Sequence, residues 1–185
     1  IKVPYSSFSA PMPQQQLHGY IVEIIPSFIG FIISFFIIGL SWVVHHRIFG
    51  RVVNFDGGLI MLNLLLLFFI ALVPFTTTLI SEYGYLSESY IYYWMNVGFI
   101  AISIYFLWAH ICHPKKKLAI KFEDDYQRRR VLARSLYTSI VFFLGAAFAM
   151  TRNNILQLAS KYIFILLFPG MIILNKIYKT PKPRR

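Results

Sequence analysis

The chain has 185 residues, of which 57% are hydrophobic and only 14% are charged, and its mean hydropathy is +0.61. A soluble domain carries about 25% charged residues, so the composition argues against a soluble enzyme, a disordered tail or a disulfide-stapled secreted module. The net charge of +11 would indicate a nucleic-acid partner in a soluble protein. The single cysteine, Cys112, cannot form an internal disulfide.

Five apolar stretches are each long enough to cross a bilayer, which takes about 20 residues of helix. The first has no charge in its interior, the second contains a run of leucines, and the fifth carries Lys161 and is interrupted by Pro169-Gly170. The sequence therefore predicts an all-α, polytopic membrane protein with a transmembrane domain over residues 26–178. In chain order, the predicted helices cover about 26–45, 57–80, 89–111, 131–150 and 155–177.

The connections predict how the helices are oriented. Residues 81–85 and 152–154 are tight turns that force antiparallel neighbours, whereas the connection after the third helix is long and basic. Fifteen of the 18 Lys and Arg residues fall on the side of that long connection and of the tail over 179–185. Positive loops face the cytoplasm, so we expect a cytoplasmic C-terminus and no nucleic-acid partner. The basic residues can also contact anionic lipid head groups.

Five spans with a cytoplasmic C-terminus place the N-terminal segment, residues 1–25, on the extracellular side. No signal peptide precedes Ile1, and Ile1-Lys2-Val3-Pro4 has the character of the outer end of a preceding helix. We therefore expect a sixth, N-terminal span in the native subunit, ahead of the five present here.

Residues that could support chemistry are few. The helix centres hold no Asp, Glu, Arg or His, and Lys161 lies near an outer helix end, where it can reach the interface. Histidines gather at the cytoplasmic rim, including His45, His46 and His110, with His113 and Cys112 beside them. Adjacent helical residues point about 100° apart, and the spacing of a zinc site is missing. We therefore predict local hydrogen bonding there, with no metal, no cofactor and no enzymatic activity.

Polar groups and small residues predict where helices meet. Trp42, His45 and His46 lie within one helical turn, and Asn63 lies about two turns into the next helix. Unsatisfied polar groups at that depth cost several kcal/mol, so these side chains need partners in each other and in the missing helix. The small residues Gly30 and Ser34 of the first helix, and Gly145 and Ala149 of the fourth, predict places where helices approach closely. Pro169-Gly170 indicates either a simple kink or the broken helix of a transporter.

The stretch Trp42-Val43-Val44-His45-His46-Arg47, followed by Asp56-Gly57, Asn63-Leu64-Leu65 and Val73-Pro74-Phe75, resembles the transmembrane protein 175 family of potassium channels. The likeness is to its small prokaryotic branch and is most specific over residues 40–80. It implies a six-helix subunit that assembles as a homotetramer around a pore lined by the first helix, where a hydrophobic constriction selects ions.

The family's hallmark Arg-x-x-x-Phe-Ser-Asp, which belongs to the first helix, does not occur in this sequence. The pore-filter residues are therefore unknown and are expected on the absent helix. By resemblance, Trp42, His45, His46 and Asn63 brace that motif from the neighbouring helices and do not bind ions.

We therefore predict a passive, potassium-preferring cation channel subunit in a prokaryotic cell membrane, with potassium ions, membrane lipids and copies of itself as partners. Hydrophobic constrictions can gate by dewetting. Two alternatives remain open: a secondary transporter, and a non-conducting membrane interaction protein or small membrane enzyme that uses the histidine rim.

Overall fold

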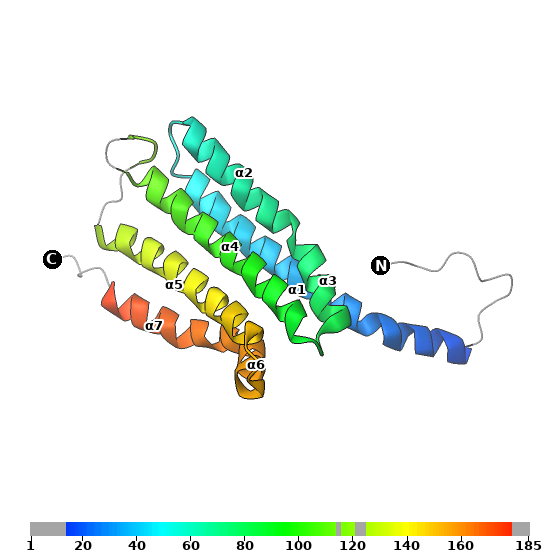
Figure 1. The fold of residues 1–185 in the computed structure, drawn as a ribbon. Helices are drawn as coiled ribbons and strands as arrows, with labels where there is room; N and C mark the ends of the chain where they lie inside the picture. Colours follow the sequence, from blue (N-terminus) through cyan, green and yellow to red (C-terminus); the bar gives the residue numbers. More distant parts are fainter. Residues whose placement is uncertain (1–13, 114–115, 121–124, 179–185) are drawn as a thin grey trace, which may run out of the picture.

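The structure is a computed structural model that describes residues 14–113, 116–120 and 125–178. Long helices lie side by side in an elongated bundle, and the last one returns along α5 (Figure 1). In order, the elements are α1 (Gln14–Phe49), α2 (Gly57–Ala71), α3 (Val73–Tyr83), α4 (Ser87–Ile111), α5 (Asp125–Met150), α6 (Asn154–Lys161), the 3-10 helix η1 (Ile163–Leu166) and α7 (Leu167–Ile177).

Within the described residues, four segments are long and apolar enough to cross a membrane: Ile24–Phe49, Gly57–Tyr83, Ser87–Ile111 and Gln127–Met150. The pair formed by α6 and the η1–α7 segment is a fifth if it counts as one span, although it is bent by 62°. The predicted all-α, multi-pass membrane fold is confirmed.

Helix α1 is longer than the sequence predicted. It begins at Gln14, twelve residues before the predicted start, and passes through Pro26. A proline is favoured in the first turn of a helix, which made residue 26 a natural start, but here it lies inside a continuous helix. The N-terminal part of α1 extends past the ends of α3 and α4 (Figure 1). Residues 1–13 of the predicted extracellular segment, and the basic tail 179–185, lie outside the described residues.

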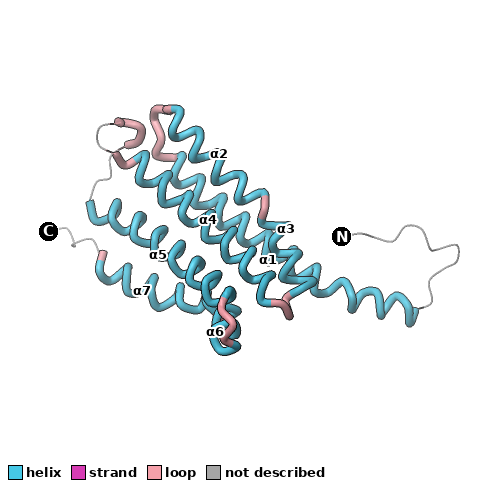
Figure 2. The backbone as a smooth tube through the Cα atoms, in the orientation of Figure 1, coloured by secondary structure: helices cyan, strands magenta, loops and turns pink. Residues whose placement is uncertain are grey.

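The second predicted helix is divided into α2 and α3 at Leu72, where Figure 2 shows a short break in the helical tube. Pro74 occupies the first turn of α3 and has no N–H to give to the preceding turn. The Leu72 N–H still reaches the Phe68 and Phe69 carbonyls at 3.2 Å. The two helices therefore stay nearly continuous and form one span.

Helix α4 is the centre of the bundle. In its most apolar stretch 56% of the residues are buried, against 17% for α1 and 17% for the α2–α3 span. One core lies between α4 and the helices α1, α2 and α3, and the other between α4, α5 and η1. The first core contains Ile48, Leu59, Leu66, Val73, Ile100, Leu107, Trp108 and Ile111, and the second contains Tyr93, Trp94, Val97, Val141, Phe142, Ala146 and Ile163.

The small residues lie where helices approach closely, as predicted. A Cβ on Gly30 would fall 2.0 Å from the Ser81 hydroxyl of α3, so α1 and α3 approach closely at this height and any larger residue would displace that side chain. One turn later, the buried Ser34 hydroxyl is hydrogen bonded to Thr77 of α3. In α5, a Cβ on Gly145 would meet Ile163 at 2.7 Å.

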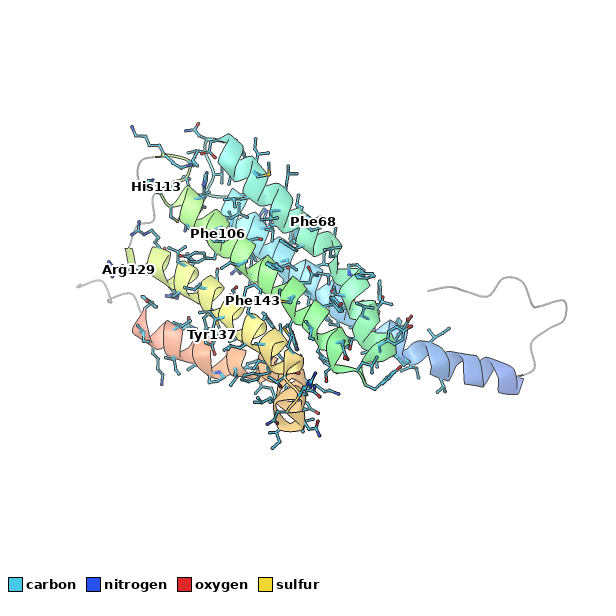
Figure 3. All side chains as sticks on the ribbon, in the orientation of Figure 1. Phe68, Phe106, His113, Arg129, Tyr137 and Phe143 are labelled. Carbon is cyan, nitrogen blue, oxygen red and sulfur yellow. The ribbon has the colours of Figure 1, made fainter. Side chains whose placement is uncertain are left out.

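The last predicted helix breaks at Tyr162, and not at Pro169-Gly170. Pro169 lies in the first turn of α7, where a missing N–H costs nothing. Gly170 instead leaves room for the Tyr137 ring of α5, which would lie 2.1 Å from a Cβ at that position. The Tyr137 hydroxyl donates to the Leu166 carbonyl at 2.5 Å, and Figure 3 places this side chain between α5 and α7. The proline-glycine pair is therefore a packing contact.

Helix α6 is held against the turn between α3 and α4. The Trp94 indole N–H donates to the Ser160 carbonyl at 3.0 Å. Lys161 donates to the Gly84 carbonyl at 3.3 Å, and its ammonium lies 5.2 Å from the centre of the Tyr90 ring. The Lys161 ammonium, which lies within the predicted fifth helix, therefore has polar and aromatic partners.

Candidate functional site at the basic end of the bundle

The end of the bundle where α1 and α4 finish and α2 and α5 begin is called here the basic end, because Arg47, Arg51 and Lys116 lie there. Three of the predicted site residues are on the last two turns of α1, and Asn63 is on α2. His45 Nε2 lies 2.8 Å from Asn63 Oδ1, so the imidazole N–H donates to the amide oxygen across the α1–α2 interface. The His45 ring also stacks on Phe49, with ring centres 4.3 Å apart.

Trp42 and His46 form a second pair on a different face of α1. Their rings are nearly parallel, at 14°, with centres 5.4 Å apart. Trp42 is 63% exposed and His46 is also exposed, so the stack projects away from the bundle. The structure thus brings the four predicted residues together as two pairs: one joins α1 to α2, and the other is presented outward.

The sequence analysis missed a third cluster at the same end. The Asp56 carboxylate lies 2.8 Å from His110 Nε2 and accepts from the Lys116 ammonium at 2.9 Å. Asp56 also accepts from the Leu59 N–H at 2.7 Å, which caps the first turn of α2. The cluster therefore ties the start of α2 to the end of α4 and to the loop that follows it. The hydrogen bonds from Lys116 and His110 hold the pKa of Asp56 well below its ordinary value.

Gly58 makes room for this cluster. A Cβ at residue 58 would fall 2.6 Å from the Cε1 atom of His110, inside van der Waals contact. Asp56 followed by two glycines carries a local signal for a helix cap with a close neighbour. Its partners, however, are 54 and 60 residues away along the chain, and no spacing rule connects them.

Backbone pairing orders the connections at the basic end. Val53 N–H donates to the Leu118 carbonyl at 2.8 Å, and Ile120 N–H donates to the Arg51 carbonyl at 2.9 Å. Leu118 itself is 4% exposed. The α1–α2 connection and the loop after α4 therefore form a short antiparallel bridge that covers the core beneath them.

The rim histidines do not assemble into a metal centre in the described part of the chain, where no three His, Cys, Asp or Glu side chains lie together. His110 is hydrogen bonded to Asp56, which is 54 residues away and is not a local partner, whereas His113 is exposed. Burial raises the pKa of the Cys112 thiol to about 11, an effect that the positive charges of Arg128 and Arg51 oppose. The thiol is therefore protonated at neutral pH, which suits neither a metal ligand nor a nucleophile.

Residues 1–74 match the family model of the endosomal/lysosomal potassium channel TMEM175. The chain is 43% identical over 58 residues to a potassium channel of Streptomyces collinus, a match that covers 31% of this chain and 28% of the relative. It is 38% identical over 99 residues to a potassium channel of Chamaesiphon minutus, covering 52% and 49%.

A potassium channel of a Chryseobacterium species is 26% identical over 140 residues, covering 74% of this chain and 69% of the relative. The chain thus matches about half or less of the length of the first two relatives. No solved structure matches it.

Proposed function

We propose that the chain belongs to the TMEM175 family, whose model matches residues 1–74, and that it is a subunit of a passive, potassium-preferring channel. The observation that carries the proposal is the place of this match: it contains α1 and most of the α2–α3 span, and with them both residue pairs of the site. Three bacterial relatives are named potassium channels. A family of potassium channels also agrees with the prediction that the chain is not an enzyme.

The packing of the bundle supports a pore made by several copies. The two cores fill the space around α4 with apolar side chains, and no ionisable residue lies at mid-depth in α1 or the α2–α3 span. These two spans therefore offer no charged side chain that could hold a cation at mid-depth inside one bundle. The large side chains exposed on α1 include Phe28, Phe31, Phe35 and Phe36. Such a surface needs lipid or other helices to cover it, which fits a homotetramer with a hydrophobic constriction.

The two residue pairs fit the bracing role. A helix packed on the outward stack of Trp42 and His46 would meet an indole N–H and an imidazole, which could form hydrogen bonds with polar side chains of that helix. The hydrogen bond from His45 to Asn63 fixes the rotation of α1 about its own axis, and with it the direction of that stack. In this proposal the four residues position a pore-lining helix and make no contact with the ion.

The proposal places the basic end and the C-terminus in the cytoplasm of a cell whose plasma membrane contains the channel. Arg47, Arg51, Lys116 and Lys117 lie at this one end of the bundle. Basic loops are retained on the cytoplasmic side.

Ion flux from liposomes that contain the complete gene product tests the function. We expect potassium to leave faster than sodium, and the current to reverse near the potassium equilibrium potential whatever the proton or sodium gradient. A reversal potential that follows one of those gradients would instead identify a secondary transporter. Electrically tight vesicles, with correctly inserted protein, would leave a non-conducting interaction protein and overturn the proposal.

A further inference from the structure

A cavity of about 320 Å³ opens between α1, α4, α5 and α7 near the basic end. Its wall is mostly apolar, but two arginines and two hydroxyls interrupt it. The lining residues are Val44 and Arg47 of α1, Ala101, Ile104 and Trp108 of α4, Val131, Arg134, Ser135 and Thr138 of α5, and Met171 of α7.

The positive charge of this cavity is not neutralised by the described part of the chain. Arg134 lies inside the Gln127–Met150 span and is half-buried, and its Nε donates to the Met171 sulfur at 3.4 Å. A thioether is a weak and uncharged acceptor. Within the described residues, neither Arg47 nor Arg134 forms an ion pair with a carboxylate. A cation within a spanning segment is costly unless it is paired, so the cavity calls for an anion.

The hydroxyls add a second requirement. Ser135 donates to the Val131 carbonyl at 3.0 Å, and Thr138 donates to the Arg134 carbonyl at 2.9 Å. Since each hydroxyl hydrogen is already used by the backbone, both oxygens can only accept from a ligand. The cavity thus offers guanidinium donors for an anion and hydroxyl acceptors for a group that carries its own O–H.

The apolar wall favours a lipid over a soluble anion. Six of the ten lining side chains are apolar, and the cavity lies between spanning helices at the level of the first turns of the α5 span. Basic pockets between transmembrane helices are typical sites for anionic head groups. A soluble phosphate would gain nothing from Val44, Ile104 or Met171, whereas the first methylenes of an acyl chain would bury against them.

We propose that this cavity binds the head group of an anionic phospholipid that carries hydroxyls, such as phosphatidylglycerol. Arg47 and Arg134 hold the phosphate, and Ser135 and Thr138 accept from the glycerol. Such a lipid would connect the two parts of the bundle, because α1 packs on α3 and α4, whereas α5 packs on α4, α6 and α7. The proposal does not depend on conduction.

Lipid binding to the complete protein, purified in detergent, tests this site. Native mass spectrometry would measure bound phosphatidylglycerol and phosphatidylcholine, and thermal melting would measure protection by each lipid and by inorganic phosphate. We expect phosphatidylglycerol to bind and protect wild-type protein, and phosphatidylcholine and phosphate to have little effect. Equal binding of the two lipids, or equal protection by phosphate alone, would overturn the proposal.

Variants separate the cavity from the general positive charge of the basic end. Arg47→Gln with Arg134→Gln should weaken phosphatidylglycerol binding about tenfold or more. The control, Lys117→Gln with Arg129→Gln, removes the same charge from exposed side chains at the same end and should leave binding within about twofold. The Arg129 side chain is labelled in Figure 3.

Arg134→Lys keeps the charge but loses the planar pair of donors, so it should bind with intermediate affinity. This variant keeps the test decisive if the double glutamine variant does not fold. Wild-type affinity in Arg134→Lys and in the double glutamine variant, or an equal loss in the control, would contradict the site.

Discussion

Replacing Asn63 with Ala removes the amide that accepts from His45 and leaves the imidazole N–H without its partner on α2. Hydrogen bonds between membrane helices contribute about 0.6 kcal/mol on average and up to about 1.7 kcal/mol. This one is 2.8 Å long and joins two half-buried side chains, so we expect a coupling energy of about 1–1.7 kcal/mol. That coupling corresponds to a change of roughly five- to eighteenfold in the unfolding equilibrium.

A double-mutant cycle measures this coupling. The free energy of unfolding in mixed micelles is determined for wild type, His45→Ala, Asn63→Ala and the double variant. The cycle cancels the loss of the His45 stack on Phe49, which occurs in both proteins that lack the histidine. Asn63→Asp keeps an acceptor oxygen and serves as the matched control. A coupling below about 0.3 kcal/mol would refute the bond as a stabilising contact.

The same variants test the bracing role through flux. We expect potassium flux to fall in Asn63→Ala, and to be unchanged in Leu64→Ala, whose side chain is exposed next to it. If the two variants conduct alike while the cycle still shows coupling, the hydrogen bond stabilises the fold but does not position the pore.

Three further outcomes are expected. Trp94→Phe leaves a buried carbonyl of α6 without its indole donor and should cost about 1–3 kcal/mol, measured by unfolding in mixed micelles. Gly170→Ala places a methyl against Tyr137 and should lower the melting temperature, and the double variant with Tyr137→Leu should recover most of the loss.

The pKa of Asp56 is depressed in the folded protein, so its stabilisation is present above the ordinary value of 3.8 and is lost as the pH falls below it. In a His110→Gln background, the stability difference between Asp56 and Asp56→Asn proteins should therefore be constant above about pH 5 and shrink below pH 3.8.

The helices were predictable because each is a continuous apolar stretch of bilayer length. Such a stretch can be recognised without knowing how the helices pack. The errors occurred where packing decides. Proline at residue 26 is equally compatible with a helix start and with the interior of a long helix, and only the latter occurs. Pro169-Gly170 has the composition of a kink, but the bend lies at Tyr162. The glycine is explained instead by the Tyr137 ring of α5, which leaves no room for a larger side chain.

The site was predictable in part, for a related reason. His45 and Asn63 are 18 residues apart, on two helices joined by a short connection, so antiparallel packing brings them to the same depth. The partners of Asp56 are far more distant in sequence and depend on the path of the loop after α4. Charge alone indicated that this loop was basic, but not that Lys116 would return to bind Asp56, the residue that caps α2.

Helix geometry gives the end of α1 its significance. Successive residues point about 100° apart, so His45 and Arg47 project about 160° from each other on opposite sides of the helix. His45 is bonded to α2, and Arg47 lines the cavity against α4, α5 and α7. The stack of Trp42 and His46 lies in the arc between them. The hydrogen bond of His45 to α2 therefore holds α1 in one rotation, and this is the condition under which an outward pair of rings can hold a neighbouring helix in register.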